Sequence, residues 1–289
     1  MQKGSIALLL WLLVSAPAQS RPAVDLRVAP PEVIQQLTLT DGSRLYGGVE
    51  SIDGAAVVFR TVGGTTMNVT AGDIKNLRVA RGRVVDNEFQ PSDSHDTRLF
   101  FSPTGRSLPR GEGYVGVYEV IMPFVQVGLT DRISIGGGTP LIFTGDNTHP
   151  FWLTPKIQIV NHERAQVAAG IIHVSLVTED GPDGGIAYTV ASMGPSDRSA
   201  TIGFGYAYAD GEHTPILMIG AEKRTGRRIK LMTENWFWPN SDVHGFVSGG
   251  IRFLGERLSA DLALIVPVTE EDFFAFPLVS FASRFWVHA

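Results

Sequence analysis

The residues best placed for chemistry are charged side chains that recur on one face of predicted strands. They are Glu119, Lys156, Glu222, Lys230, Glu234, Arg252, Asp261 and Arg284. Because successive strand side chains point to opposite faces, we expect all of them to face the interior of a barrel while their apolar neighbours face outwards. Four are acids and four are bases, and charges that leave bulk water are tolerated when they pair. The pattern predicts a lumen-facing polar network, which either fills the lumen or lines a narrow pore.

Histidine and serine residues raise the alternative of catalysis. His173 and Ser175 are two residues apart, so they share a strand face and could form a general-base pair. Neither the glycine pattern of a nucleophile elbow nor a third, orienting carboxylate accompanies them. His149, His213 and His244 fall in or beside predicted loops without the spacing of a closed metal site. We therefore predict no enzymatic activity, no cofactor and no metal, and keep an outer-membrane hydrolase as an alternative.

The elements that position these residues follow a rhythm from Thr97 onwards, in which short alternating segments are joined by connections that are alternately tight and long. The tight connections are Thr130–Asp131, Asn161–Arg164, Gly194–Arg198, Thr225–Arg228 and Gly255–Arg257. The long ones are Pro103–Gly113, Phe143–Pro150, Thr178–Gly184, Ala209–Thr214, Pro239–Gly245 and Pro267–Phe276. This alternation is typical of an up-and-down antiparallel transmembrane β-barrel, whose periplasmic turns are short and whose external loops are longer.

The strand pattern gives a count of about twelve. Thr201–Tyr208 is representative, because Ile202, Phe204, Tyr206 and Tyr208 oppose small residues on the other face. The count of twelve admits Arg98–Ser102 as the first strand and treats Tyr114–Gly128 as a single segment; the alternative is ten. Aromatic residues near the predicted external ends, Trp236 among them, suggest an interfacial girdle.

A small β-domain precedes the barrel at residues 29–80. Turn dipeptides such as Asp41-Gly42 and Asp53-Gly54 separate five short strands between Gln35 and Val79. This segment resembles a small Sm-like or SH3-like barrel, with Gly47 and Gly48 permitting a strongly bent second strand. The RNA-binding role of the Sm-like family is not carried over, because no cluster of aromatic and basic residues is present. Residues 81–96 drop the alternation and are predicted to be a linker, and residues 97–289 form the barrel.

The N-terminus and the charge balance indicate location and partners. Residues 1–20 have a basic start at Lys3, an apolar run and small residues at cleavage spacing, which predict a secretory signal peptide. The chain has no cysteine, so neither a disulfide framework nor a lipid-modified cysteine is available. With 24 basic and 29 acidic residues the formal net charge is −5, which argues against a nucleic-acid partner. The expected partners are outer-membrane lipid and a periplasmic protein bound by the small domain.

Three segments near the start of the barrel carry a family resemblance. These are Thr97–Arg106, Gly111–Tyr114 and Gly128–Gly138. They resemble the opening of a family of uncharacterised bacterial envelope β-barrel proteins, which implies an outer-membrane location but no activity or site residues. The sequence therefore predicts an all-β outer-membrane barrel that acts as a narrow channel or as a structural or binding component of the cell envelope. A soluble periplasmic or secreted β-protein that binds a ligand or a protein partner is the main alternative.

Overall fold

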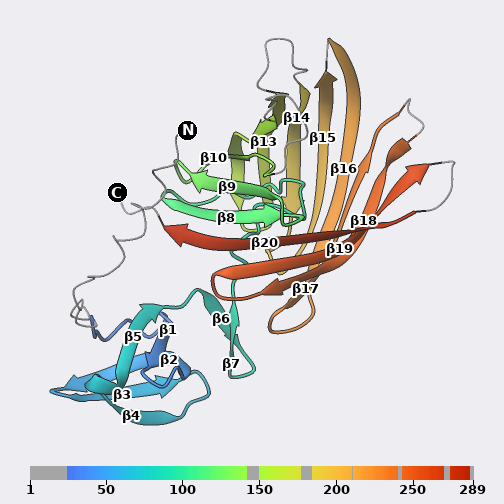
Figure 1. The fold of residues 1–289 in the computed structure, drawn as a ribbon. Coiled ribbons are helices and arrows are strands. Elements are labelled where there is room, and N and C mark those ends of the chain that lie inside the picture. Colours follow the sequence, from blue (N-terminus) through green and yellow to red (C-terminus); the bar gives the residue numbers. More distant parts are fainter. Residues whose placement is uncertain are drawn as a thin grey trace, which may run out of the picture. The chain divides into compact units, whose positions relative to one another are not determined.

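The computed structural model describes residues 25–141, 150–176, 184–209, 211–239, 243–269 and 274–286 (Figure 1). The predicted signal peptide lies outside the described residues. The chain forms two compact units, one reaching Ala80 and including Asp86–Glu88, the other comprising Arg81–Val85 and the chain from Phe89 onwards. Among the described residues, no helix has the length and apolar character needed to cross a membrane.

The N-terminal unit is a five-stranded antiparallel sheet, as predicted. Its strands are β1 (Gln35–Leu39), β2 (Arg44–Asp53), β3 (Ala56–Thr61), β4 (Thr66–Thr70) and β5 (Ile74–Val79), in the order β4-β3-β2-β1-β5. One face forms a core of Leu37, Val49, Val57, Phe59, Val69 and Ile74. Strand β2 pairs with β1 up to Gly47 and with β3 from Gly47 onwards. A Cβ atom at position 47 would lie 1.8 Å from the Arg60 carbonyl oxygen, so only glycine fits. The likeness of this sheet to Sm-like domains stays a prediction.

The C-terminal unit is a closed antiparallel barrel. Its strands are β8 (Glu112–Tyr118), β9 (Met122–Gly128), β10 (Ile133–Gly138), β11 (Pro150–Leu153), β12 (Lys156–His162), β13 (Ala165–Leu176), β14 (Gly184–Met193), β15 (Arg198–Ala209), β16 (Glu212–Arg224), β17 (Ile229–Phe237), β18 (Val243–Leu254), β19 (Leu258–Thr269) and β20 (Phe276–Trp286). Neighbouring strands along the chain pair with each other, except that β11 and β12 both pair with β10 and β13 and not with one another; β20 pairs with β8 to close the ring. Strands β11 and β12 share one register against β13 and are interrupted near Pro155, which lacks an N–H donor. Counting them as one gives a barrel of twelve strands among the described residues.

The predicted number of strands is confirmed, but two of the segments behind it differ. Arg98–Ser102 is not a barrel strand, and Tyr114–Gly128 folds into both β8 and β9. In the turn between these strands, the backbone of Glu119 and Val120 has φ values of 49° and 64°, which residues other than glycine rarely adopt. No turn dipeptide marks this position, so the sequence pattern does not reveal it.

The barrel has two distinct rims. We call the "turn rim" the end that carries the start of β8, the end of β20 and the tight connections after β9, β12, β14, β16 and β18. The "loop rim" is the opposite end. The predicted alternation of short and long connections has two exceptions at the loop rim. The first connection, Glu119–Ile121, is short, and the predicted long connection Ala209–Thr214 is wrong because β15 ends at Ala209 and β16 already begins at Glu212.

The outer wall of the barrel is apolar. Large apolar side chains on it retain between 36% and 62% of their surface. They include Val115, Ile133, Ile157, Ile171, Ile202, Phe204, Ile219, Leu231, Val247, Phe253, Leu258, Leu262, Leu264 and Phe281. Alternate residues on the same strands point inwards and are buried, as Ser259, Asp261 and Ala263 are on β19. The wall thus has the alternation of a lipid-facing barrel.

This outer wall predicts a strong penalty for a charge on β19. Leu262→Arg should destabilise the barrel folded into lipid vesicles by about 2–4 kcal/mol, because position 262 faces outwards near the middle of its strand. Leu262→Ala is the control, since it shortens the side chain without adding a charge. Urea titration of vesicle-reconstituted protein measures both. Equal effects of arginine and alanine would contradict a lipid-facing wall.

Candidate functional site

The segment before β8 fills the lumen. Residues 81–96 are not an extended linker: β6 (Gly82–Val85) pairs with β7 (Glu88–Pro91), and the chain then enters the barrel. We call residues 92–109 the plug segment. His95 and Thr104 are fully buried, although the segment is rich in polar residues. Such burial requires partners for the polar groups, and the barrel wall supplies them.

The plug segment rises from the turn rim and returns to it. Its first limb begins at Asp93, which contacts Lys230 near the start of β17. Its tip is a tight turn in which the Leu99 N–H donates to the Ser102 carbonyl over 2.8 Å. The second limb descends through Gly105, whose N–H donates to Ser192 Oγ over 2.9 Å near the end of β14. The chain then continues into β8.

Arg252 on β18 joins the wall to the first limb of the plug segment. Its Nε donates to Asp261 Oδ1 over 2.7 Å on the neighbouring strand β19. Its Nη1 lies 3.2 Å from Asp93 Oδ2, and its Nη2 donates to the Leu99 carbonyl over 2.6 Å. Asp261 also binds Arg98 of the plug segment, with 3.1 Å between Oδ2 and Nη1. One fully buried guanidinium group therefore holds the wall and the plug segment together.

A second cluster ties both limbs of the plug segment to β16 and β17. Lys230 Nζ lies 2.5 Å from Asp93 Oδ2 and 2.8 Å from Glu222 Oε2. The other oxygen of Glu222 accepts from Arg106 Nη1 over 2.8 Å. The chain Asp93–Lys230–Glu222–Arg106 thus connects the entering limb to the returning limb through two wall residues.

Glu234 and Lys156 bind the backbone of the plug segment. Glu234 Oε2 accepts from the N–H groups of Phe101 and Ser102 over 2.9 and 3.0 Å. Lys156 Nζ donates to the carbonyls of Thr97, Thr104 and Arg106 over 3.0, 3.3 and 2.6 Å. These contacts satisfy backbone groups that would otherwise be buried without partners.

Apolar packing completes the seat of the plug segment. Leu99 and Phe100 at the tip pack with Met232, Ala263, Ile265 and Leu278 of the wall. A cavity of about 70 Å³ remains between the plug segment and the wall, lined in part by Arg98, Tyr118 and Trp152. A space of this size holds no more than a few water molecules, so the plug segment fills most of the lumen around these residues.

The predicted site residues lie in three different parts of the barrel. Six of them, Lys156, Glu222, Lys230, Glu234, Arg252 and Asp261, are at most 6% exposed and contact the plug segment. Glu119 lies instead in the turn after β8, where its Oε1 accepts from the Val279 N–H over 3.0 Å. Arg284 lies at the turn rim and pairs with Glu112. Glu119 and Arg284 therefore stand apart from the plug contacts.

The partners on the plug segment are the residues that sequence reasoning missed. Asp93, Asp96, Arg98 and Arg106 belong to the plug segment, and Asp93, Arg98 and Arg106 make the ion pairs described above. The wall contributes three acids and three bases, and the plug segment contributes two of each. Each surface is therefore neutral by itself, and together they are complementary.

The residues considered for catalysis and metal binding are placed differently. His173 Nδ1 lies 3.0 Å from the Tyr208 hydroxyl, so its near partner is Tyr208. A histidine–serine contact does occur between His95 Nδ1 and Ser259 Oγ at 2.7 Å, but these residues are 0% and 3% exposed. Among the described residues, no three histidine, aspartate or glutamate side chains form a metal-ligand group.

Comparison with known proteins gives structural neighbours only. No family model matches the chain, and no curated protein matches it. A KdgM porin in complex with disordered oligogalacturonate aligns with a TM-score of 0.46 and 5% identity, over 60% of this chain and 98% of that chain. A loop L8 deletion mutant of OmpT, an outer membrane protein of Vibrio cholerae, gives 0.37 and 11%, over 88% and 96%. OmpF of Salmonella typhi in complex with daunomycin gives 0.37 and 11%, over 88% and 95%. The fold described above rests on the strand pairing of this chain.

Loss of Arg252 should weaken the seat of the plug segment strongly. Arg252→Met leaves Asp93 and Asp261 with less of their compensating charge, and removal of one partner from a buried pair typically costs about 3–5 kcal/mol. Arg164→Met, at an exposed arginine of a turn-rim connection, is the control and should change the free energy of unfolding by less than about 0.5 kcal/mol. Denaturant titration compares the two. A similar small effect of both would show that the Arg252 contacts contribute little.

His95 of the plug segment should make the free energy of unfolding decrease at acidic pH. Burial lowers the pKa of His95 from its usual 6.5 to about 3, with Arg98 and Arg252 adding to the shift while Asp93 and Asp261 oppose it. Between these values the unfolded chain binds a proton that the folded chain does not, so stability falls as the pH drops below 6.5. His95→Gln removes this effect.

The pH test is a difference between two proteins. Relative to the wild type, the His95→Gln variant should gain about 1.4 kcal/mol of unfolding free energy for each pH unit below 6.5. Other groups, Asp96 among them, titrate in both proteins and largely cancel in the comparison. Denaturant titrations at pH 7, 6, 5 and 4 measure the difference. A difference that stays constant with pH would show that His95 is protonated in the folded protein.

Proposed function

We propose that this protein is an outer-membrane channel whose lumen is closed by its own plug segment. The turn rim and the small N-terminal domain face the periplasm in this proposal, and the loop rim faces outwards. The observation that carries it is the polar, complementary contact between the plug segment and six charged wall residues.

The outer wall supports the placement in a membrane. Monomeric soluble proteins rarely expose contiguous apolar patches beyond a few hundred Å². Here outward apolar residues occur on strand after strand, for example Leu258, Leu262 and Leu264 on β19, all more than half exposed. Such a wall is unfavourable in water and is satisfied by lipid. This argues against the soluble β-protein considered as an alternative.

The chemistry of the plug contacts supports a separable closure. A barrel filled permanently could be packed with apolar residues, which are often as stable as buried ion pairs or more so. Here the wall around the plug segment and the plug segment itself carry charges that water can solvate once they separate. Both surfaces can therefore face water in a second state, in which the plug segment has left and the lumen is open.

The charges of the wall also indicate what the open lumen would select. Glu222, Glu234 and Asp261 are balanced by Lys156, Lys230 and Arg252. With no excess of either sign, we propose that the open channel distinguishes weakly between cations and anions. Channel selectivity would then depend mainly on size.

The small domain is proposed to act in the periplasm. It is joined to the plug segment by residues 81–91, so a periplasmic protein that binds the domain would act on the chain directly next to the closure. We propose a protein rather than a nucleic acid as its partner.

Planar bilayer recordings test the channel. Wild-type protein should show rare openings, and Arg252→Met should raise the open probability at least tenfold, because it weakens plug seating by more than about 1.4 kcal/mol. Arg164→Met should behave like the wild type. If all three proteins insert into the bilayer and none of them conducts, the proposed channel is contradicted and the barrel is permanently filled.

Thiol labelling gives an independent readout of plug release. The chain has no cysteine, and Ser102 at the plug tip is 3% exposed. A Ser102→Cys variant should react slowly with a membrane-impermeant thiol reagent and at least tenfold faster when Arg252→Met is added. Equal labelling rates would show that the plug segment stays seated without Arg252.

A further inference from the structure

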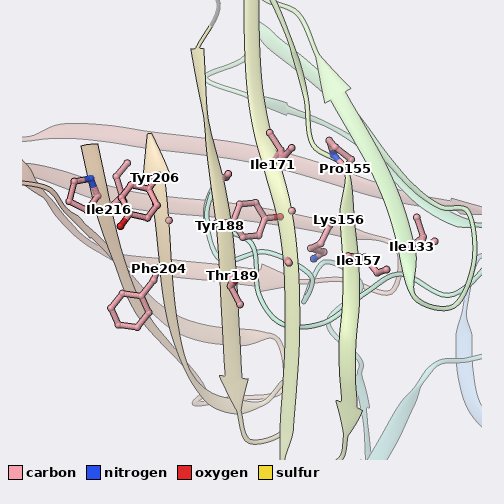
Figure 2. A pocket seen from close by; sticks show the side chains of 15 residues that line it. Ile133, Pro155, Lys156, Ile157, Ile171, Tyr188, Thr189, Phe204, Tyr206 and Ile216 are labelled. Atoms are coloured by element: carbon pink, nitrogen blue, oxygen red, sulfur yellow. The ribbon is translucent and has the colours of Figure 1, made fainter. Parts of the chain in front are cut away.

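A groove lies on the outer wall of the barrel. It has a volume of about 760 Å³ and crosses β10 and the strands from β12 to β16. Figure 2 shows Ile133 and Ile157 on one side and Phe204 and Tyr206 on the other, with Ile171 and Thr189 between them. Small residues such as Ala169 and Ala187 contribute to the lining, so the wall is recessed between larger side chains.

The same strands carry two cations at the turn rim. Arg198 on β15 lies directly opposite Lys223 on β16 in the strand register, and both are exposed. Their neighbours Ser199 and Glu222 are buried in the lumen, so alternation places Arg198 and Lys223 on the outer face. Like charges in opposed positions repel each other.

No acid compensates this pair within the described part of the chain. The nearest carboxylate in sequence, Asp197, is paired with Arg224 at 2.5 Å and with Arg83 at 2.8 Å. Glu222 is held in the lumen by Lys230 and Arg106. Two exposed cations on a lipid-facing wall therefore remain available for an anion that the protein does not supply.

The distance from the cations to the groove matches one leaflet of a membrane. Phe204 follows Arg198 by six positions, which is about 20 Å along a strand. With a strand tilt of about 40° this corresponds to a height of about 15 Å, half of the hydrocarbon core of about 30 Å. Between the two, Ala200 and Ile202 face outwards and are apolar.

We propose that the outer wall of β13–β16 binds one anionic phospholipid. Arg198 and Lys223 bind its phosphate, and an acyl chain runs past Ala200 and Ile202 into the groove. The positive pair favours an anionic phospholipid over a zwitterionic one, because the second cation is left uncompensated when the headgroup is neutral overall. The proposal rests on the placement of the barrel in a membrane and is independent of channel activity.

Native mass spectrometry of the refolded mature protein in detergent tests this site. Phosphatidylglycerol is titrated against phosphatidylcholine, and glycerol phosphate serves as the headgroup without chains. One phosphatidylglycerol should be retained per barrel, at least tenfold more tightly than phosphatidylcholine, and glycerol phosphate should not compete at equal concentration. The charge variant Arg198→Gln/Lys223→Gln should weaken phosphatidylglycerol about thirtyfold.

A groove variant separates the chain from the headgroup. Ala187→Phe fills the recess and should reduce retention at least tenfold, whereas Ala260→Phe, on the outer face of β19, is the matched control and should leave it unchanged. Arg164→Gln is the control for a rim charge outside the site. Heat-modifiable migration, measured first, confirms that each variant is folded and separates a failure of the barrel from a failure of the site.

Three results would overturn the proposal. Equal retention of both lipids by the wild type would show a nonspecific lipid layer. Loss in the charge variant but not in Ala187→Phe, or competition by glycerol phosphate, would show a phosphate site without a bound chain. Loss in Ala187→Phe alone would show an apolar groove that does not select the headgroup.

Discussion

Arg252 lies in the lumen without access to solvent, and a buried guanidinium group is tolerated only if anions and acceptors surround it. Its partners come from two sources, Asp261 on the adjacent strand and Asp93 with three backbone carbonyls of the plug segment. Asp261 accepts from Nε and Nη2, whereas every acceptor of Nη1 comes from the plug segment. The position of the plug segment in the lumen therefore depends on a compensation of charge between parts of the chain separated by more than 150 residues.

The same requirement explains the composition of the plug segment. A run that contains Asp93, Asp96, Arg98 and Arg106 cannot be buried against an apolar wall, and a wall with Glu222, Lys230 and Asp261 cannot be covered by an apolar segment. The apolar contacts are concentrated at the tip, where Leu99 and Phe100 meet Met232 and Leu278. The polar contacts thus set where the segment lies, and the tip adds hydrophobic burial.

The sequence predicted the wall better than its contents. Alternation on β17–β19 placed Lys230, Glu234, Arg252 and Asp261 on one face, and the same rule would have placed Trp236 in the lumen rather than in a girdle, since it is 5% exposed and shares the face of Glu234. The plug segment was not recognised because a polar run with turn residues looks the same whether water or a charged wall surrounds it. The count of twelve is right because two errors cancel. Arg98–Ser102 is not a barrel strand, and Tyr114–Gly128 contains two strands separated by the turn at Glu119–Val120.

Both limbs of the plug segment meet the same rim, where Asp93 enters beside Lys230 and the chain leaves into β8. The segment is thus a loop laid into the lumen and not a strand threaded through it. No chain end has to pass through the barrel when the loop enters or leaves, and the pairing of β8 with β20 can stay intact. The topology therefore allows the loop to be inserted into, or withdrawn from, a barrel that has already closed.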